Sequence, residues 1–336
     1  MRAGLFLEVG RVLPGELDKP VPGEGEALIK ISYAGICGTD MMIYAGKHPR
    51  AKAPLALGHE FCGMIEQVNG QGGFAAGDRV VVEPTLSCGT CDACRAGQNH
   101  VCRTLKLIGI DKHGGFAEYV TAPLHRLHRV PEELSDELAA LTEPLACAVH
   151  TVRRSRVKVG DTVAVLGAGP IGLLVGLVAK LAGAQRIIIS DISPYRLSVA
   201  KQLGFTALNA KETNVVESVK ALTEGKGADV VFEVAGTPAT AKQMVEIAKI
   251  QGEIFVVSVF KEPPAVDLAN MHYREISLTT SRCYSGGDFS AAMQMMAANM
   301  LDLSPLISHR IGLHDIAEGF ELMKNTEQSL KILIRP

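Results

Sequence analysis

Residues 162–191, TVAVLGAGPIGLLVGLVAKLAGAQRIIISD, carry the pattern from which the fold class follows. The runs TVAVL and RIIISD are short and apolar, as buried strands are, and LLVGLVAKLAG between them has helical periodicity. The glycine-rich turn GAGPIG connects the first strand to the helix. The stretch therefore predicts a strand–helix–strand unit, which is the repeating element of a parallel sheet.

The turn GAGPIG has the glycine spacing of a dinucleotide-binding turn. Gly167 permits the tight turn, Gly169 lets the backbone approach a pyrophosphate, and Gly172 lets the helix pack closely on the strand. Pro170 and Ile171 begin the helix, whose free N–H groups and positive dipole end suit phosphate groups. A glycine-rich turn that binds no ligand is the alternative, and the matching strand–helix–strand context disfavours it.

An acidic residue ends the second strand of this unit. Asp191 stands 19 residues after Gly172, where a carboxylate accepts hydrogen bonds from both ribose hydroxyls of the cofactor. The same negative charge repels a 2′-phosphate, so the pattern favours NAD over NADP. Arg196 leaves NADP open as an alternative, because its guanidinium could meet a 2′-phosphate.

Strands and helices continue to alternate downstream, through ADVVFEVAG, a helix near 238–250 and GEIFVVSV, which indicates a doubly wound parallel sheet. The first 130 residues differ, because short strands with glycine and proline punctuation predict a mostly antiparallel, barrel-like domain there. The pattern changes again at DFSAAMQMMAANML, a predicted helix, and the final KILIRP is a predicted strand. A chain of 336 residues accommodates these two domains, at about 150 residues each.

Charge and hydropathy exclude several classes of function. A net charge of −2 gives no electrostatic basis for binding nucleic acid or an anionic membrane. The chain has no apolar run near the roughly 20 residues that a membrane span needs. Its first residues, MRAGLFLEVGR, are too short and too polar for a signal peptide. We therefore expect a cytoplasmic protein whose eight cysteines are reduced, metal-bound or buried.

Four cysteines follow one another at the spacing C-x2-C-x2-C-x7-C, namely Cys88, Cys91, Cys94 and Cys102. Four thiolates that converge on one point are the ligand set of a tetrahedral structural zinc, which stabilises a lobe too small to bury its own core. Disulfides and an iron–sulfur cluster are the alternatives. Disulfides need an oxidising compartment, and cluster motifs usually place a proline after the last cysteine, where this chain has Arg103.

A second set of metal-binding side chains is scattered along the chain. Cys37 lies in AGICGTD, His59 and Glu60 lie in LGHEFCG, and Glu143 lies in LTEPLA. Each residue alone is a weak signal, since a lone cysteine is more often buried filler than a ligand. Together they supply one thiolate, one imidazole and two carboxylates. This combination predicts an open zinc site that leaves a position for water or substrate.

Taken jointly, the motifs resemble the zinc-containing medium-chain dehydrogenases of the alcohol dehydrogenase superfamily. The matching segments are AGICGTD, GHEFCG, GDRVVVEP, the four-cysteine lobe, GGFAEYV, EPLACAVH and GAGPIG, in the family's order. Within the family the chain is most similar to the polyol (sorbitol) and butanediol dehydrogenases. Those branches carry a glutamate in the E-P-L motif, where ethanol-type enzymes carry a third cysteine at the catalytic site.

The resemblance implies an α/β protein with a GroES-like, mostly-β catalytic domain and a Rossmann NAD domain, which is a doubly wound parallel sheet. The catalytic domain would span residues 1–147, with the structural-zinc lobe at about 86–104. The Rossmann domain would span 148–285, and residues 286–336 would return to the catalytic domain.

The resemblance also assigns roles around the catalytic zinc. Cys37 and His59 would bind the metal directly. Glu60 would be a ligand, or would lie behind the metal and exchange with water. Glu143 would be the fourth ligand or would hold the metal's water. Asp40 would orient His59 and fix the tautomer of its ring.

The same resemblance assigns the residues that would transfer the proton. Thr39 would take the proton from the substrate hydroxyl. Family members commonly read C-G-T-D-x-H, with a histidine that passes the proton outward, but Met42 stands at that place in this chain. The proton would then leave through Thr39, the ribose and water, or through His48 in the loop YAGKHPR. An exposed loop position without catalytic role is the alternative for His48.

Near the nicotinamide, the resemblance places two short segments along the cofactor and an arginine beside the substrate region. These residues are Val234, Ala235, Gly236, Val259, Phe260 and Arg282.

The expected reaction is the reversible oxidation of a secondary alcohol to a ketone with NAD, using one catalytic and one structural zinc per chain. Zinc suits this reaction because it lowers the pKa of an alcohol. The expected substrate is a small polyol, sugar acid or vicinal diol. An L-threonine 3-dehydrogenase and a non-catalytic NAD-binding regulator are the alternatives. The resemblance also implies a homotetramer or homodimer, paired through an edge strand near 276–283.

Overall fold

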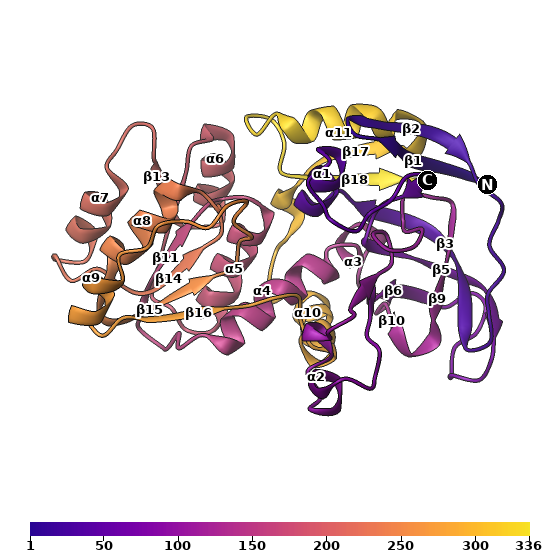
Figure 1. Cartoon of the computed structure of the whole chain (residues 1–336), viewed down its shortest axis with the longest axis horizontal. Coiled ribbons are helices and arrows are strands. Elements are labelled where there is room, and N and C mark those ends of the chain that lie inside the picture. The colour runs from indigo at the N-terminus through magenta and orange to yellow at the C-terminus, as the bar shows by residue number, and fades with distance from the viewer. The chain divides into compact units, whose positions relative to one another are not determined.

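The computed structural model describes all residues from Met1 to Pro336, and the chain divides into two compact units (Figure 1). The first unit combines Met1–Glu143 with Ser285–Pro336, and the second is Pro144–Tyr284. The first unit is therefore discontinuous, and it is completed only by the C-terminal part of the chain.

A seven-stranded sheet forms the centre of the first unit. Its order is β10-β6-β5-β3-β18-β17, with β9 also paired to β3. The strands are antiparallel except for the pair β17–β18. They are β3 (Glu26–Gly35), β5 (Glu60–Asn69), β6 (Arg79–Val82), β9 (Tyr119–Pro123), β10 (Leu127–Arg129), β17 (Ile307–Gly312) and β18 (Lys331–Arg335).

The last strand of the chain pairs with one of the first. Leu333 of β18 lies opposite Gly35 of β3, and Ile334 lies opposite Ala34. This antiparallel pair brings the C-terminus beside the residues that precede Cys37. The predicted C-terminal strand therefore forms part of the wall of the candidate metal site.

Smaller elements complete the first unit. Two short sheets are formed by β1 (Arg2–Glu8), β2 (Arg11–Glu16) and β4 (Leu55–Ala56), and by β7 (Thr85–Leu86) and β8 (Lys106–Leu107). The helices are α1 (Gly38–Tyr44), α2 (Asp92–Arg95), α3 (Asp136–Ala139), α10 (Gly286–Ala297) and α11 (Ile316–Lys324). Fully buried aromatic side chains, including an edge-to-face pair of Phe116 and Phe320, fill the interior of this unit.

The second unit is built on a six-stranded parallel sheet of order β13-β12-β11-β14-β15-β16. The order reverses between β12 and β14, on either side of β11. This is the doubly wound arrangement expected from the sequence, and it creates a ligand-binding crevice at the carboxyl ends of the strands. The strands are β11 (Thr162–Leu166), β12 (Arg186–Asp191), β13 (Thr206–Asn209), β14 (Ala228–Glu233), β15 (Ala248–Val256) and β16 (Ser277–Thr280).

Helices lie on both sides of this sheet (Figure 1). On one face, Val219 and Met244 pack with the strand residues Ala164, Val231 and Ile254 in one buried cluster. Apolar side chains on both strand faces account for the continuous hydrophobic runs in the sequence. The helices are α4 (Thr142–Arg154), α5 (Pro170–Leu181), α6 (Pro194–Gln202), α7 (Val215–Leu222), α8 (Pro238–Ile247) and α9 (Leu268–Tyr273).

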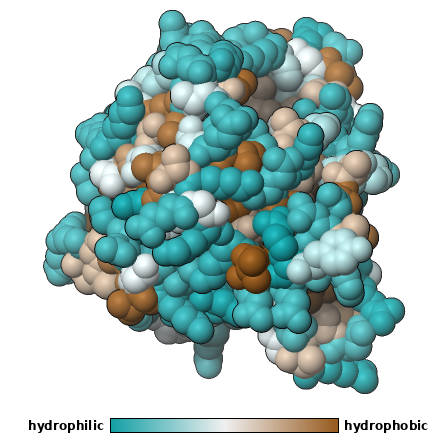
Figure 2. All heavy atoms as spheres, turned by 90° about the vertical axis from the view of Figure 1, so that its left-hand side faces the viewer, coloured by the Kyte–Doolittle hydropathy of each residue, from teal (hydrophilic) through white to brown (hydrophobic).

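The surface view in Figure 2 shows a face on which hydrophilic residues predominate, with hydrophobic ones scattered among them. Isolated apolar residues of this kind are normal on a protein surface and indicate no docking site. None of the helices has both the length and the apolar character needed to cross a membrane.

Candidate active site and metal centres

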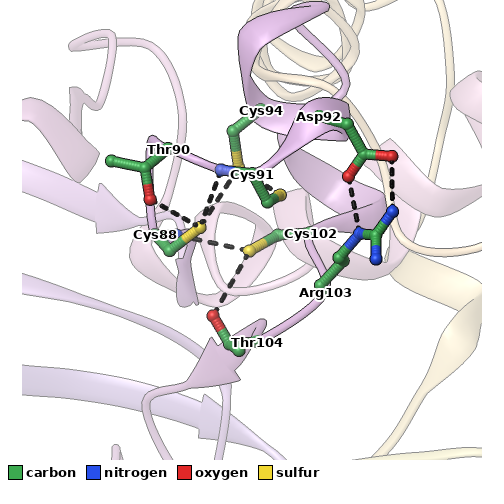
Figure 3. Close-up of polar contacts among 8 residues, drawn as sticks. All are labelled: Cys88, Thr90, Cys91, Asp92, Cys94, Cys102, Arg103 and Thr104. Carbon is green, nitrogen blue, oxygen red and sulfur yellow. Dashed lines mark hydrogen bonds and ion pairs between the residues drawn. The ribbon is translucent and has the colours of Figure 1, made fainter.

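The four predicted lobe cysteines converge around α2 (Figure 3). Their sulfur atoms all lie within 4.8 Å of one another. The Sγ atoms of Cys91 and Cys94 are 3.5 Å apart, and those of Cys88 and Cys94 are 4.0 Å apart. A tetrahedral zinc with Zn–S bonds of about 2.3 Å separates its sulfur ligands by about 3.8 Å. The arrangement therefore fits one zinc ion.

The ionisation of these thiols supports the same conclusion. Backbone N–H groups of Thr90 and Cys91, with the Thr90 hydroxyl, lower the pKa of Cys88 to about 5. Burial and the neighbouring thiols raise the pKa of Cys94 to about 12. Without a cation, the four groups cannot all be thiolates at neutral pH. A divalent ion at their centre would allow it, as zinc binding requires.

The second predicted group also comes together. Possible ligand atoms of Cys37, His59 and Glu60 lie within 4.8 Å of one another. Cys37 follows the end of β3, and Glu60 begins the neighbouring β5 opposite Gly35. A Cβ at position 35 would lie 2.3 Å from Glu60 Oε2, so glycine there leaves the space that the carboxylate fills.

Asp40 connects the two sides of this group. Its Oδ2 accepts a hydrogen bond of 2.8 Å from the Cys37 backbone N–H, in the first turn of α1. Its Oδ1 lies 3.6 Å from His59 Nδ1, beyond hydrogen-bond distance, and both of these buried atoms have no other partner. Because Nδ1 faces Asp40, Nε2 is the ring nitrogen left to bind a metal.

The electrostatics of the site favour a cation. Burial lowers the pKa of His59, but the negative charges of Asp40 and Cys37 outweigh this effect and raise the pKa well above its usual value. In the metal-free site, a proton on the imidazole is therefore stabilised by the surrounding anions. The same anionic surroundings and donor set fit a zinc ion.

Lys331 is a functional residue that the sequence analysis missed. Its Nζ donates to Glu60 Oε2 over 2.5 Å and to the Ile36 carbonyl over 3.2 Å. The residue is only 2% exposed. Burial lowers its pKa, yet Glu60, Cys37 and Glu143 together raise it, so the amine stays charged. In the sequence, Lys331 is only a lysine at the start of a predicted strand, and a lysine in such a position is usually exposed to solvent.

Glu143 lies at the edge of the cluster. It is buried in the first turn of α4, and its charge acts on Lys331. It is not among the three residues whose ligand atoms lie within 4.8 Å of one another. The structure thus groups Glu60, not Glu143, with Cys37 and His59.

Thr39 and His48 lie on α1 and in the loop that follows it. The Thr39 hydroxyl is 3.9 Å from Cys37 Sγ. Nδ1 of His48 accepts from the backbone N–H groups of Arg50 and Ala51, at 3.4 and 3.3 Å, so Nε2 carries the proton of the neutral ring. Burial and the charge of Arg50 lower the pKa of His48, and His59 and Asp40 also act on it. His48 is therefore neutral at pH 7, within electrostatic reach of the metal group.

A cavity of about 410 Å³ in the second unit contains the predicted cofactor residues Gly167, Gly169, Asp191, Arg196, Val234 and Ala235. Its wall also includes residues that sequence analysis did not single out, among them Thr237, Thr240 and Gln243. Polar side chains in the first turn of a helix give no distinctive sequence signal, which explains the omission.

The glycines have the geometry that the turn requires. Gly167 has a φ of +116°, in the region that favours glycine. A Cβ on Gly172 would lie 1.9 Å from the carbonyl oxygen of Gly167, so no other residue fits there without a shift of the backbone. Gly169 is the N-cap of α5, and Pro170 and Ile171 begin that helix.

Asp191 is held next to this turn. Its carboxylate accepts hydrogen bonds from the backbone N–H groups of Ala168, at 2.7 Å, Ile192, at 2.7 Å, and Ser193, at 2.9 Å. Its position at the pocket is therefore fixed by the backbone on both sides, before any cofactor binds.

Seven predicted residues are not part of the cavity wall, namely Pro170, Ile171, Gly172, Gly236, Val259, Phe260 and Arg282. Among them, Gly236 lies next to Val259, because a Cβ on Gly236 would be 3.3 Å from the carbonyl oxygen of Val259. Val259 and Arg282 are exposed. The structure does not place these residues against a cofactor.

A dinucleotide pocket suits hydride transfer, and an open Cys/His/Glu site near a threonine hydroxyl suits the oxidation of an alcohol. Together they place the chain in the class of metal-dependent dehydrogenases. Comparisons with known proteins then define the family.

Residues 23–132 match the family model described as alcohol dehydrogenase GroES-like domain, and residues 170–298 match the one described as zinc-binding dehydrogenase. The chain is 39% identical to 2-dehydro-3-deoxy-L-galactonate 5-dehydrogenase of Pseudoalteromonas atlantica, over 93% of this chain and 92% of that protein. It is 37% identical to L-threonine 3-dehydrogenase of Bacillus subtilis, over 94% and 93% of the two chains. A crystal structure of a zinc-binding dehydrogenase from Sinorhizobium meliloti, bound to NADP, superimposes with a TM-score of 0.93 at 33% identity, covering 100% and 99% of the chains.

The chain therefore belongs to the zinc-containing medium-chain alcohol dehydrogenase family. It is an alcohol dehydrogenase with zinc and NAD(P) as cofactors. The predicted combination of a GroES-like domain with a Rossmann domain is confirmed.

Proposed function

We propose that this enzyme oxidises a secondary alcohol of a polyol, sugar acid or vicinal diol to the ketone, with NAD as the hydride acceptor. The observation that carries the proposal is the group of Cys37, His59 and Glu60 with a second carboxylate, Glu143, at its edge. A relative that shares 39% identity is named for a sugar-acid dehydrogenase activity, which supports this substrate class.

The bound zinc would supply a Lewis acid for the alcohol oxygen, and the nicotinamide a hydride acceptor. Cys37 and His59 hold the metal, with Glu60 or Glu143 as a further ligand. Asp40 keeps the His59 ring in the orientation that presents Nε2. Thr39, whose hydroxyl is 3.9 Å from Cys37 Sγ, accepts the proton that leaves the substrate hydroxyl.

His48 continues the proton path in place of the histidine that Met42 replaces. Its pKa is lowered, chiefly by burial and then by Arg50, so the neutral ring is available near pH 7. To relay a proton, the ring must accept it at Nδ1 and release one from Nε2, so Nδ1 must first part from the backbone N–H groups of Arg50 and Ala51. Arg282 and the segments near Val259 are proposed to approach the nicotinamide when the cofactor is bound.

The proposal is tested by following NADH formation with zinc-replete enzyme and a panel of alcohols. The panel holds sorbitol, xylitol, inositol, sugar acids, polyol phosphates, butanediol and threonine, and the Cys37→Ala variant is the control. Turnover of one polyol, sugar acid or diol that this variant lacks supports the proposal. Absence of turnover on all of them, with zinc and NAD bound, contradicts it.

L-threonine 3-dehydrogenase activity is the second candidate, favoured by the relative of that name at 37% identity. In the same panel, threonine as the only substrate would establish it. A non-catalytic NAD-binding regulator would bind NADH and zinc normally and oxidise none of the alcohols.

Asp191 is expected to determine the preference for NAD. Replacing it by alanine should shift the ratio of kcat/KM for NAD and NADP toward NADP by about tenfold or more, because a charge that repels the 2′-phosphate and binds the ribose is lost. Steady-state kinetics with both cofactors measures this ratio. Arg196→Ala is the control and should shift this ratio in the opposite direction, because the guanidinium that could bind a 2′-phosphate is lost. An unchanged ratio in Asp191→Ala would contradict the assignment.

A homodimer or homotetramer paired through β16 is proposed for the assembly. β16 is an edge strand of the parallel sheet, and Leu278 in it is 44% exposed. A free edge offers unpaired backbone groups to a second copy of the chain. Light scattering coupled to size-exclusion chromatography should show at least a dimer, and Leu278→Lys should weaken it. Val159→Lys, at a site 87% exposed in another part of this unit, should leave the assembly unchanged.

The cytoplasm is proposed as the place of action. Four thiols held at metal-ligand spacing require reducing conditions to stay available to zinc. Cell fractionation with an antibody against the chain tests this location.

A further inference from the structure

The chemistry proposed above makes no use of Glu233, a carboxylate in the interior of the cofactor-binding unit. Glu233 ends β14 and is 0% exposed. A buried carboxylate is costly unless hydrogen bonds compensate for the lost water. Its partners therefore show what the residue is for.

One carboxylate oxygen of Glu233 accepts hydrogen bonds from three donors. Oε1 accepts from the backbone N–H of Ala235 at 3.0 Å, from the backbone N–H of Gly236 at 2.7 Å, and from the Thr240 hydroxyl at 2.7 Å. The other oxygen, Oε2, accepts from the hydroxyl of Ser258. Hydrogen bonds to an ionised group are the strong ones, so four of them fix this side chain and its partners together.

These partners belong to two separate segments. Ala235, Gly236 and Thr240 come from the loop after β14 and the first turn of α8. Ser258 comes from the loop after β15. The backbone carbonyl of Glu233 also binds the loop after β15. It accepts hydrogen bonds from the N–H groups of Val257, at 2.9 Å, and Ser258, at 3.2 Å.

The first of these segments forms the cofactor cavity. Val234, Ala235, Thr237 and Thr240 are all part of its wall. The loop also packs on the glycine turn, since a Cβ on Gly167 would lie 3.2 Å from the backbone nitrogen of Ala235. A displacement of the loop would therefore change the cavity on the side opposite Asp191's strand.

Thr240 links the carboxylate to the start of α8. Its backbone N–H donates to the Thr237 hydroxyl, and the backbone N–H of Thr237 donates to the Thr240 hydroxyl, which is a capping box. Because the Thr240 hydroxyl also donates to Glu233, the carboxylate determines where this helix begins relative to β14.

We infer that Glu233 is a positioning residue for the dinucleotide: by holding the 234–240 and 257–260 segments together, it preorganises the cavity that receives the cofactor. Glu233 itself does not face the ligand. Its loss would leave the two backbone N–H groups without their acceptor and would free the loop to move. Cofactor binding would then have to reorder the loop, which lowers affinity.

A purely structural role is the competing explanation, and the chain offers a matched control for it. Glu253 is a second buried glutamate of the same sheet, 5% exposed, in the middle of β15. Its carboxylate accepts from the backbone N–H of Arg156 at 2.7 Å, and it does not contribute to the cofactor cavity. Removing it should affect stability without affecting the cofactor.

The experiment compares Glu233→Ala and Glu233→Gln with Glu253→Ala and Glu253→Gln. The Kd for NADH is measured by titrating the fluorescence of the nucleotide, with Tm measured in parallel. The chain contains no tryptophan, so protein emission does not interfere. Glu233→Ala should raise the Kd by about tenfold or more. Glu233→Gln, which keeps one acceptor oxygen, should recover part of this loss, and both Glu253 variants should bind NADH like the wild type.

A milder variant remains informative if Glu233→Ala does not fold. Ser258→Ala removes one hydrogen bond to the carboxylate at a residue outside the cavity wall and should raise the Kd by about threefold to tenfold. The KM for the cofactor should rise with the Kd, whereas the KM for the alcohol should not change. Wild-type affinity in folded variants with a lowered Tm would overturn the inference. No alcohol is needed for the binding measurement, so the result is independent of the substrate proposed above.

Discussion

Replacing Lys331 by methionine should lower the free energy of unfolding by about 3–5 kcal/mol, because it leaves a buried carboxylate without its partner. Lys331 Nζ forms an ion pair with Glu60 Oε2 at 2.5 Å, and both side chains are almost completely buried. Methionine has a similar length and fills the space, so the expected loss is electrostatic and not a cavity effect. Chemical denaturation of the two proteins measures it.

The double variant Lys331→Met with Glu60→Gln distinguishes an electrostatic loss of stability from a loss caused by a cavity. Neutralising the carboxylate removes the uncompensated charge, so this protein should be more stable than Lys331→Met alone. Lys106→Met, at an exposed position, should change the free energy of unfolding by less than about 0.5 kcal/mol. A Lys331→Met protein as stable as the wild type would show that the pair contributes nothing.

The second large effect is expected at the zinc lobe. Cys102→Ser should reduce the bound zinc by one ion per chain and open the lobe around residues 86–104 to proteolysis. Apparent binding free energies of structural zinc in small domains are about 10–16 kcal/mol, and folding of the lobe depends on this energy. Serine does not replace the thiolate, and Cys102 is buried at the centre of the lobe. Zinc analysis by mass spectrometry and limited trypsin digestion follow the two effects.

Cys62→Ser is the matched control for this variant. Cys62 is buried in β5 and donates to the carbonyl oxygen of Asp136 at 3.0 Å, a bond that serine can keep. Its pKa is raised by burial, so it is a neutral thiol and not a metal ligand. Zinc content should stay at the wild-type value. If Cys102→Ser retained its zinc and its resistance to trypsin, the lobe would not depend on the metal.

Sequence reasoning predicted two groups of possible metal ligands whose members the structure brings together, because thiols and imidazoles in such motifs are distinctive. The set from Cys88 to Cys102 could be predicted from spacing alone, whereas Cys37 and His59 are weak signals singly, were predicted only as part of a set, and received their individual roles from the family's motifs. Lys331 escaped notice for a physical reason. A lysine at the start of a strand is normally exposed, and only the pairing of β18 with β3 brings it beside Glu60. Such a contact between distant segments has no local signature.

The same holds for the second unit. The glycine turn and Asp191 could be predicted because each has a local geometric requirement. Glu233 could not, since its role comes from Ser258, which lies in another loop. β13 was also missed, because its four residues are all half-buried and show neither alternation nor an apolar run. Pairing with β12 determines that strand more than its own composition does.

The interleaving of the two units has a consequence for how the enzyme is made. Residues 144–284 are contiguous and can fold as soon as the ribosome has released them. The first unit cannot be completed at that stage, because β18 follows the second unit along the chain and carries Lys331. A nascent chain that stops early would keep Glu60 without its amine partner. Synthesis of β18 is thus a condition for an intact metal site, and a chain that stops before Lys331 should bind nucleotide but have a defective site around Cys37, His59 and Glu60.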